Sequence, residues 1–169
     1  MEGSVEIPHA CYVLQELNKQ RLSEGALCDC VLVSGTSRFS AHRGVLGAVC
    51  PYFRTKFKDG FADSFSKEEH LPEVAPDNAK VFLDFVYTGV LRLTEDSVED
   101  VLSLTDFLCM DDLKVRCSHY LEDLLTVNSC LWVQFLADRY SVTPLSQKVV
   151  DFMSPVFDEI CQRDEVMTV

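Results

Sequence analysis

Hydrophobic and polar residues alternate and cluster along this chain in a way that predicts a small sheet among many helices. Between residues 28 and 34 the alternating pattern has apolar residues on both faces, which indicates a well-covered strand. Gly35 lies in a turn that leads to a return strand over 38–42. A helical period then follows, and Pro51 suits the first turn of a second short helix.

Before and after this segment the apolar period is mostly helical. Residues 8–24 form an amphipathic helix, with Gly25 at its C-terminal end. A polar loop, 58–69, precedes a brief strand at 70–71. Another helix begins at Pro76 and ends at Gly89, and a short strand is predicted at 91–93.

The last part of the chain is predicted to be entirely helical. Helices start near Asp96 and at Asp111, a further helical stretch opens at Thr126, and a break at 143–144 precedes a helix over 145–161. Apolar inner faces are assigned to the first three of these helices: Val98, Val101, Leu102, Thr105 and Leu108; Leu113, Val115, Cys117, Tyr120, Leu121 and Leu124; Trp132, Phe135, Leu136 and Tyr140.

Two separate blocks of residues resemble the BTB (POZ) domain. The first contains Asp29, then Ala41-His42-Arg43, then Pro51-Tyr52-Phe53; the second ends on Tyr87-Thr88-Gly89. Both occur in the order that the family shows, and the resemblance covers roughly residues 9–125. It implies an α+β fold of the BTB/POZ type, with a small mixed sheet flanked by a cluster of helices.

The tail extends this resemblance. Asn128-Ser129-Cys130-Leu131 followed by Phe135-Leu136-Ala137-Asp138 is similar to the start of the BACK domain, the helical region after BTB in kelch-like adaptors. The expected division is a BTB/POZ domain over 1–125 and the truncated start of a BACK-like region over 126–169. We therefore expect a fragment or an isoform of a longer adaptor, whose missing C-terminal region would hold the substrate protein.

Charge and hydropathy narrow the classes of partner. Lys and Arg total 15 against 27 Asp and Glu, a net charge of -12, which disfavours nucleic acid and suits a protein partner. No apolar run is long enough to cross a bilayer, and the N-terminus lacks the layout of a signal peptide. These features favour the cytoplasm, or the nucleus as well.

The eight cysteines and four histidines could in principle bind a metal ion or take part in catalysis. The eight cysteines include no CxxC pair and lie mostly in apolar stretches, so buried thiols are favoured over disulfides or zinc, although an exposed thiol would be open to oxidation. No histidine has a nucleophile or carboxylate at a recognisable spacing, and the resemblance makes His42 a structural residue. We expect no catalytic residue, no metal and no cofactor.

The resemblance also implies a homodimer. In BTB proteins the first helix packs against its counterpart in a second subunit, and this assigns Tyr12, Val13 and Leu17 to the interface. Asp29 and Arg43 match a charged pair near that interface. An aspartate in a strand is otherwise unfavourable, because aspartate is depleted in strands and a buried charge requires a partner.

A cullin-3 site is the other functional expectation. Phe61-Ala62-Asp63 aligns with a motif of cullin-binding BTB domains, although the family has glutamate where this chain has Asp63. Aromatic residues in a polar loop are typical interface anchors. The residues assigned to the N-terminal domain of cullin-3 are Phe61, Asp63, Ser64, Leu108, Met110, Asn128 and Leu131.

Three non-enzymatic functions remain open at this stage. A cullin-3 adaptor of a ubiquitin ligase is favoured, because the BACK-like helices follow the BTB region directly. A transcriptional repressor would carry zinc fingers after a linker and present a groove to corepressor peptides. A purely structural oligomerisation module would have no affinity for cullin.

Overall fold

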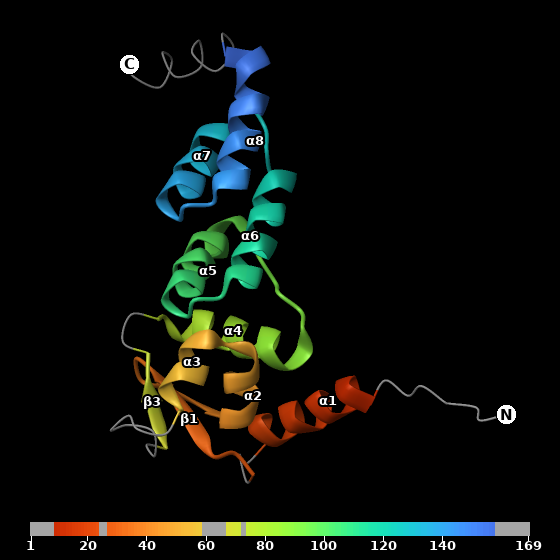
Figure 1. The fold of residues 1–169 in the computed structure, drawn as a ribbon, viewed down its shortest axis with the longest axis vertical. Helices are drawn as coiled ribbons and strands as arrows, with labels where there is room; N and C mark the ends of the chain where they lie inside the picture. The colour runs from red at the N-terminus through yellow and green to blue at the C-terminus, as the bar shows by residue number, and fades with distance from the viewer. Residues whose placement is uncertain (1–8, 24–26, 59–66, 72–73, 158–169) are drawn as a thin grey trace, which may run out of the picture. The chain divides into compact units, whose positions relative to one another are not determined.

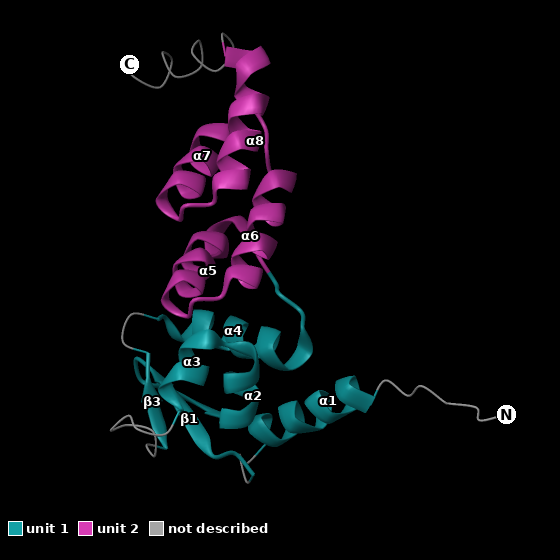
Figure 2. Cartoon of the chain, in the orientation of Figure 1, with its two compact units in different colours: residues 1–92 teal, residues 93–169 magenta. Residues whose placement is uncertain are grey.

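The computed structural model describes residues 9–23, 27–58, 67–71 and 74–157, and divides the chain into two compact units, 1–92 and 93–169 (Figures 1 and 2). Each unit has its own architecture. The first contains all the strands of the described residues and helices α1 to α4; the described residues of the second contain helices only. The predicted domain boundary after residue 125 was based on a resemblance to known families, not on compactness, and it stays a prediction.

The first unit contains a three-stranded mixed sheet. Its order is β2-β1-β3, with β1 (Cys30–Ser34) antiparallel to β2 (Ser37–Ala41) and parallel to β3 (Glu68–His70). Gly35, at φ +54°, makes the turn between β1 and β2, a conformation that glycine adopts without steric cost. The predicted hairpin is therefore confirmed, but β1 begins at Cys30, so Asp29 precedes the strand.

Four helices complete the first unit. These are α1 (His9–Leu22), α2 (Arg43–Val49), α3 (Pro51–Lys56) and α4 (Pro76–Thr88). Pro51 and Pro76 occupy first turns, and Gly89 ends α4 at φ +70°, as predicted. The core includes Leu32, Leu46, Phe53 and Phe82, all with no exposed surface.

Residues 91–93 do not form the predicted strand. They have no regular secondary structure, and no strand of the described residues pairs with them. The alternation of apolar Leu91 and Leu93 with Arg92 indicates a strand only where a neighbouring strand supplies hydrogen bonds.

The second unit consists of two helical hairpins. The first pairs α5 (Glu95–Phe107) with α6 (Asp111–Asp123), and the second pairs α7 (Cys130–Arg139) with α8 (Thr143–Met153), which continues as the 3-10 helix η1 (Ser154–Val156). The predicted inner face of α5 is confirmed, since Val98, Val101, Leu102, Thr105 and Leu108 are all buried.

Three predictions for the second unit were wrong in detail. Residues 126–129 form a turn before α7, and the predicted break at 143–144 is the first turn of α8, since proline is tolerated there. Val115 and Phe135 are exposed rather than inward, at 51% and 55%. On α7 the buried residues are Cys130, Val133, Leu136 and Ala137, so the predicted Leu136 is buried, as is Tyr140 after the helix, whereas the buried face turns toward Val133 and Ala137 and away from Phe135.

Candidate interaction surfaces

Helix α1 presents much of its apolar surface to solvent. Tyr12 and Val13 are exposed at 58% and 40%, and Leu17 is half-buried. The buried position of this helix is Arg21, near its C-terminal end. The three residues assigned to the dimer interface therefore lie on one helix whose N-terminal half has an available apolar surface.

Arg21 attaches α1 to α4. Its Nη2 donates to Asp84 Oδ1 at 2.6 Å, its Nε donates to Asn18 Oδ1 at 2.7 Å, and its guanidinium lies 4.9 Å from the centre of the Tyr87 ring. Sequence reasoning missed this residue. A basic residue near the end of an amphipathic helix is ordinarily solvent-exposed, so no pattern identifies it.

The side chain of Asp29 contacts the backbone of Arg43. Asp29 Oδ1 accepts a hydrogen bond from the Arg43 N–H at 2.8 Å, and both residues line a shallow hollow of about 510 Å³. The other lining residues are Gly44, Gly47, Arg54, Phe57 and Lys58. The carboxylate of Asp29 is thus exposed beside the start of α2, and the expected buried strand aspartate is not observed.

A buried carboxylate lies next to this pair. Glu69, on β3, has 1% of its surface exposed; its Oε2 is 2.6 Å from Lys56 Nζ and its Oε1 is 3.9 Å from Arg43 Nη1. Burial opposes the charge of Lys56, but the hydrogen bond and charge of Glu69 outweigh it and raise the pKa of that ammonium group. Arg43 also lies 4.0 Å above the Phe57 ring. This cluster joins α2, α3 and the sheet.

His42 is bound inside the first unit by Tyr87. The tyrosine hydroxyl accepts from the His42 backbone N–H at 2.9 Å and is 2.8 Å from Nδ1, while Nε2 is 3.6 Å from Cys28 Sγ. Burial lowers the pKa of His42, against a smaller opposing effect of Asp29, and burial raises the pKa of Tyr87 to about 12. Both side chains are therefore neutral near pH 7, as suits a scaffold.

Free thiols account for the cysteines. None of the seven cysteines in the described residues forms a disulfide; Cys30, Cys50, Cys117 and Cys130 are buried, whereas Cys11 and Cys109 are exposed. Burial raises the pKa of Cys30 and of Cys117 to about 12, which keeps both protonated. No cluster of three or more metal-ligating side chains occurs in the part of the chain that the structure describes.

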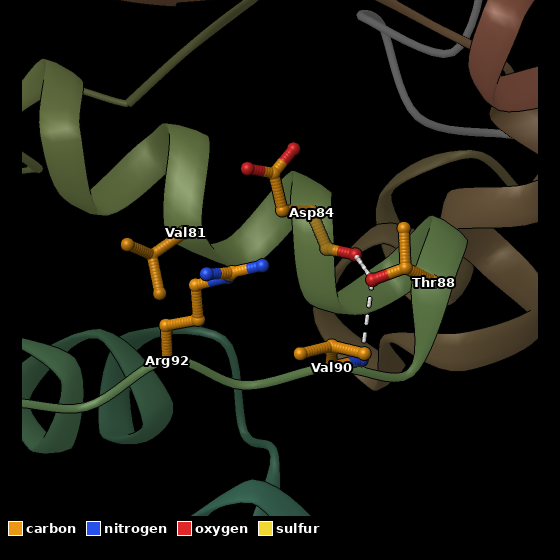
Figure 3. A pocket seen from close by; sticks show the side chains of 5 residues that line it. All are labelled: Val81, Asp84, Thr88, Val90 and Arg92. Carbon is orange, nitrogen blue, oxygen red and sulfur yellow. Dashed lines mark hydrogen bonds between the residues drawn. The ribbon is translucent and has the colours of Figure 1, made fainter.

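A second hollow of about 320 Å³ lies at the C-terminal end of α4 (Figure 3). Val81, Asp84, Thr88, Val90 and Arg92 line it, and Thr88 Oγ1 bridges the Asp84 carbonyl oxygen and the Val90 N–H. The carboxylate of Asp84 already forms an ion pair with Arg21, so the residues that line the hollow include no activated nucleophile or general base.

The residues assigned to cullin differ in their accessibility. Phe61, Asp63 and Ser64 lie outside the described residues. Leu108 has no exposed surface and Met110 has 5%, so neither side chain presents an apolar contact surface here. The exposed residues of that loop are Cys109 and Asp111.

Asn128 and Leu131 are at the start of α7. Both are exposed, Leu131 at 43%. The turn that leads to them is fixed by paired hydrogen bonds: the Thr126 N–H donates to Ser129 Oγ at 2.9 Å, and the Ser129 N–H donates to Thr126 Oγ1 at 3.2 Å. The segment after residue 125 therefore begins with a hydrogen-bonded turn, and its Asn128 and Leu131 are accessible.

Comparison with known proteins identifies the family. The sequence matches the BTB/POZ domain over residues 17–125, more than half of the chain. The chain belongs to the BTB/POZ family. Solved BTB structures agree: the BTB domain of zebrafish PATZ1 superposes with a TM-score of 0.65 at 27% identity, over 72% of this chain and 99% of that one. The BTB domain of human gigaxonin gives 0.60 at 30% identity, over 71% and 98%. The predicted α+β BTB fold is confirmed.

Similarity to curated BTB proteins extends beyond the BTB region. Kelch repeat and BTB domain-containing protein 8 of Xenopus tropicalis is 32% identical over 160 residues, 94% of this chain, and human Kelch-like protein 2 is 31% identical over 155 residues, 92% of it. The chain spans about a quarter (26%) of the length of each. The predicted kinship with kelch-like proteins is confirmed. No helix among the described residues is long and apolar enough to span a membrane.

Proposed function

We propose that this BTB protein is a non-catalytic adaptor: it dimerises and recruits the N-terminal domain of cullin-3 to a RING ubiquitin ligase complex. The observation that carries the proposal is the extent of the kelch-like similarity. It covers 92–94% of the chain and so includes α7 and α8, which directly follow the BTB match. In a BTB repressor, a linker would follow the BTB domain instead.

The surface of α1 supports the dimeric part of the proposal. Tyr12 and Val13 expose apolar area on a helix that Arg21 fixes to the rest of its unit. Burial of such area against the same helix of a second copy would form an isologous interface, the commonest arrangement of homo-oligomers. The substrate protein would be held by a region outside this chain, as the greater length of the relatives suggests.

The cullin-binding part rests on the family resemblance and on Leu131. This leucine is exposed at the start of α7, where the family has the extension that reinforces cullin contact. Phe61 and Asp63 supply the motif in the preceding unit. Phe61 would be the apolar anchor, and Asp63 would supply the acid with one methylene less than glutamate.

Calorimetric titration with the cullin-3 N-terminal domain tests the proposal. We expect one cullin per BTB chain, and Phe61→Ala is expected to weaken binding by roughly 2 kcal/mol or more, the scale of an interface hot spot. Phe65→Ala, outside the motif, is the control and should weaken it less. Asp63→Glu should leave affinity unchanged or improve it. If the wild-type chain shows no binding at tens of micromolar, a repressor or a pure oligomerisation module becomes the better interpretation.

A further inference from the structure

The hydroxyl group of Ser129 closes the turn between α6 and α7. Its Oγ accepts from the Thr126 N–H at 2.9 Å and donates to the Leu124 carbonyl oxygen at 2.6 Å. The Ser129 N–H in turn donates to Thr126 Oγ1 at 3.2 Å. Leu124 is the C-cap of α6, and the last carbonyls of a helix have no partner within that helix. One side chain therefore links the end of α6 to the start of α7.

A similar cap precedes α5, but it lacks this link. Thr94 and Ser97 form the same reciprocal pair, the Thr94 N–H to Ser97 Oγ at 3.0 Å and the Ser97 N–H to Thr94 Oγ1 at 3.2 Å. Among the described residues, however, Ser97 Oγ bonds only to Thr94. The two caps use the same residue types, and they differ because the second is also bonded to the helix that precedes it.

Ser129 lies between two residues assigned to the cullin surface. Asn128 directly precedes it, and Leu131 is two positions later, in the first turn of α7. Both are exposed, so packing fixes their direction less than it fixes that of a buried side chain. Their direction therefore depends on the backbone of the turn, which the hydrogen bonds of Ser129 hold in place.

We propose that Ser129 is a positioning residue for cullin-3: the link to α6 holds Asn128 and Leu131 in the direction in which they contact the cullin domain. This role of Ser129 rests on the proposed function. A contact residue contributes most to affinity when the free protein already holds it in the bound direction, since less conformational freedom is then lost on association. Ser129 is half-buried and uses its hydroxyl within the turn, so it acts through its neighbours.

The alternative is that Ser129 only caps α7. A capping hydroxyl stabilises the helix that it begins, whatever that helix contacts. Ser97 has this capping role in α5, so it is a matched control. The residues at the corresponding places beside Ser97 are Asp96 and Glu99, and neither is assigned to the cullin surface.

Calorimetric titration of the whole chain with the cullin-3 N-terminal domain compares Ser129→Ala with Ser97→Ala. We expect Ser129→Ala to raise the Kd at least about five-fold and Ser97→Ala to raise it less than about two-fold, although both remove a helix cap and lower the Tm by similar small amounts. Circular dichroism at the titration temperature verifies that both variants are folded.

A second comparison shows whether Ser129 acts through its neighbours. In a chain that already carries Asn128→Ala and Leu131→Ala, Ser129→Ala should change the Kd by less than about two-fold, because the contacts that it positions are absent. Equal effects of Ser129→Ala and Ser97→Ala on affinity, or an undiminished effect of Ser129→Ala in that background, would overturn this role. Wild-type binding that Ser129→Ala leaves unchanged would overturn it alone, whereas a wild-type chain that does not bind the cullin domain would overturn the proposed function as well.

Discussion

The hydroxyl group of Tyr87 holds His42 at two points, the backbone N–H at 2.9 Å and the ring Nδ1 at 2.8 Å. The hydroxyl oxygen accepts from the backbone N–H, and the same group lies within hydrogen-bond distance of Nδ1. The other ring nitrogen, Nε2, is 3.6 Å from Cys28 Sγ. The two sequence blocks that resemble the family, Ala41-His42-Arg43 and Tyr87-Thr88-Gly89, are therefore parts of one hydrogen-bonded contact across 45 residues.

Tyr87→Phe should destabilise the first unit. It leaves a buried N–H and a buried ring nitrogen without their partner, which costs about 1–3 kcal/mol. Urea unfolding followed by circular dichroism would measure the loss. Tyr120→Phe is the control: this half-buried tyrosine on α6 has no hydrogen bond from its hydroxyl in the described part of the chain. Equal stability of Tyr87→Phe and wild type would show that the contact contributes nothing.

His42 should make stability depend on pH. Burial lowers its pKa below the unfolded value of about 6.5. Between the two values the unfolded chain binds more protons, so the free energy of unfolding should fall as the pH falls below about 6.5. The decrease should end once the pH is below the folded pKa.

Unfolding measured between pH 7.5 and 5.5 would show this dependence. In His42→Gln the slope attributable to this group should disappear, whereas His119→Gln, an exposed position on α6, should retain the wild-type slope. A stability profile that is the same for His42→Gln and wild type would exclude His42 as its source.

Arg21→Met should loosen α1. The substitution keeps an unbranched apolar stem but removes the hydrogen bonds to Asp84 and Asn18, at a cost of about 1–2 kcal/mol because Asp84 is half-exposed and screened by water. Hydrogen exchange should become faster along α1. Lys19→Met, which breaks an exposed ion pair with Glu16, is expected to leave stability and exchange nearly unchanged, because solvent screens such a pair. Similar exchange in both variants would contradict the anchoring role of Arg21.

The sequence was sufficient for the fold because its signals are local and mutually consistent. Pro51, Pro76, Gly35 and Gly89 are positioned as turn and cap chemistry requires. Sequence patterns predicted the wrong structure where a partner distant in the sequence determines the conformation. Residues 91–93, for example, would form a strand only if another strand paired with them.

The candidate site was less predictable for the same reason. Arg21 and Glu69 are buried charges that distant partners compensate, and neither is visible as a pattern. Met110 is apolar at an expected contact position, but only the packing of the helices shows that it is buried. Position in the motif therefore assigned residues to a proposed cullin surface without showing which of them are accessible.

If the proposed dimer forms through α1, a charged side chain at Val13 should prevent dimerisation. Val13→Glu should convert a dimer, about twice 19.1 kDa in light scattering, into a monomer, because an unpaired charge in an apolar interface costs several kcal/mol. Val13 is 40% exposed, so the fold of the single chain should survive, as circular dichroism would verify. Val115→Glu is the control on an exposed valine of α6. A wild-type monomer at micromolar concentration would rule out this interface.

The last prediction concerns Leu131, an accessible residue of the proposed cullin surface. Leu131→Ala should weaken binding of the cullin-3 N-terminal domain by about 1–2 kcal/mol with little change in Tm, because this side chain is exposed and would be desolvated only in the complex.

Met110→Ala should instead lower the free energy of unfolding by about 2–4 kcal/mol, because it removes a side chain that is only 5% exposed. Any loss of affinity in Met110→Ala should then follow from loss of folded protein, and should diminish when titrations are performed well below its Tm. Phe135→Ala, exposed one turn after Leu131 on α7, separates a specific contact from a general loss of apolar surface. If Leu131→Ala binds cullin as tightly as wild type, the start of α7 does not contribute to the site, and the contact must depend on the Phe61 motif alone.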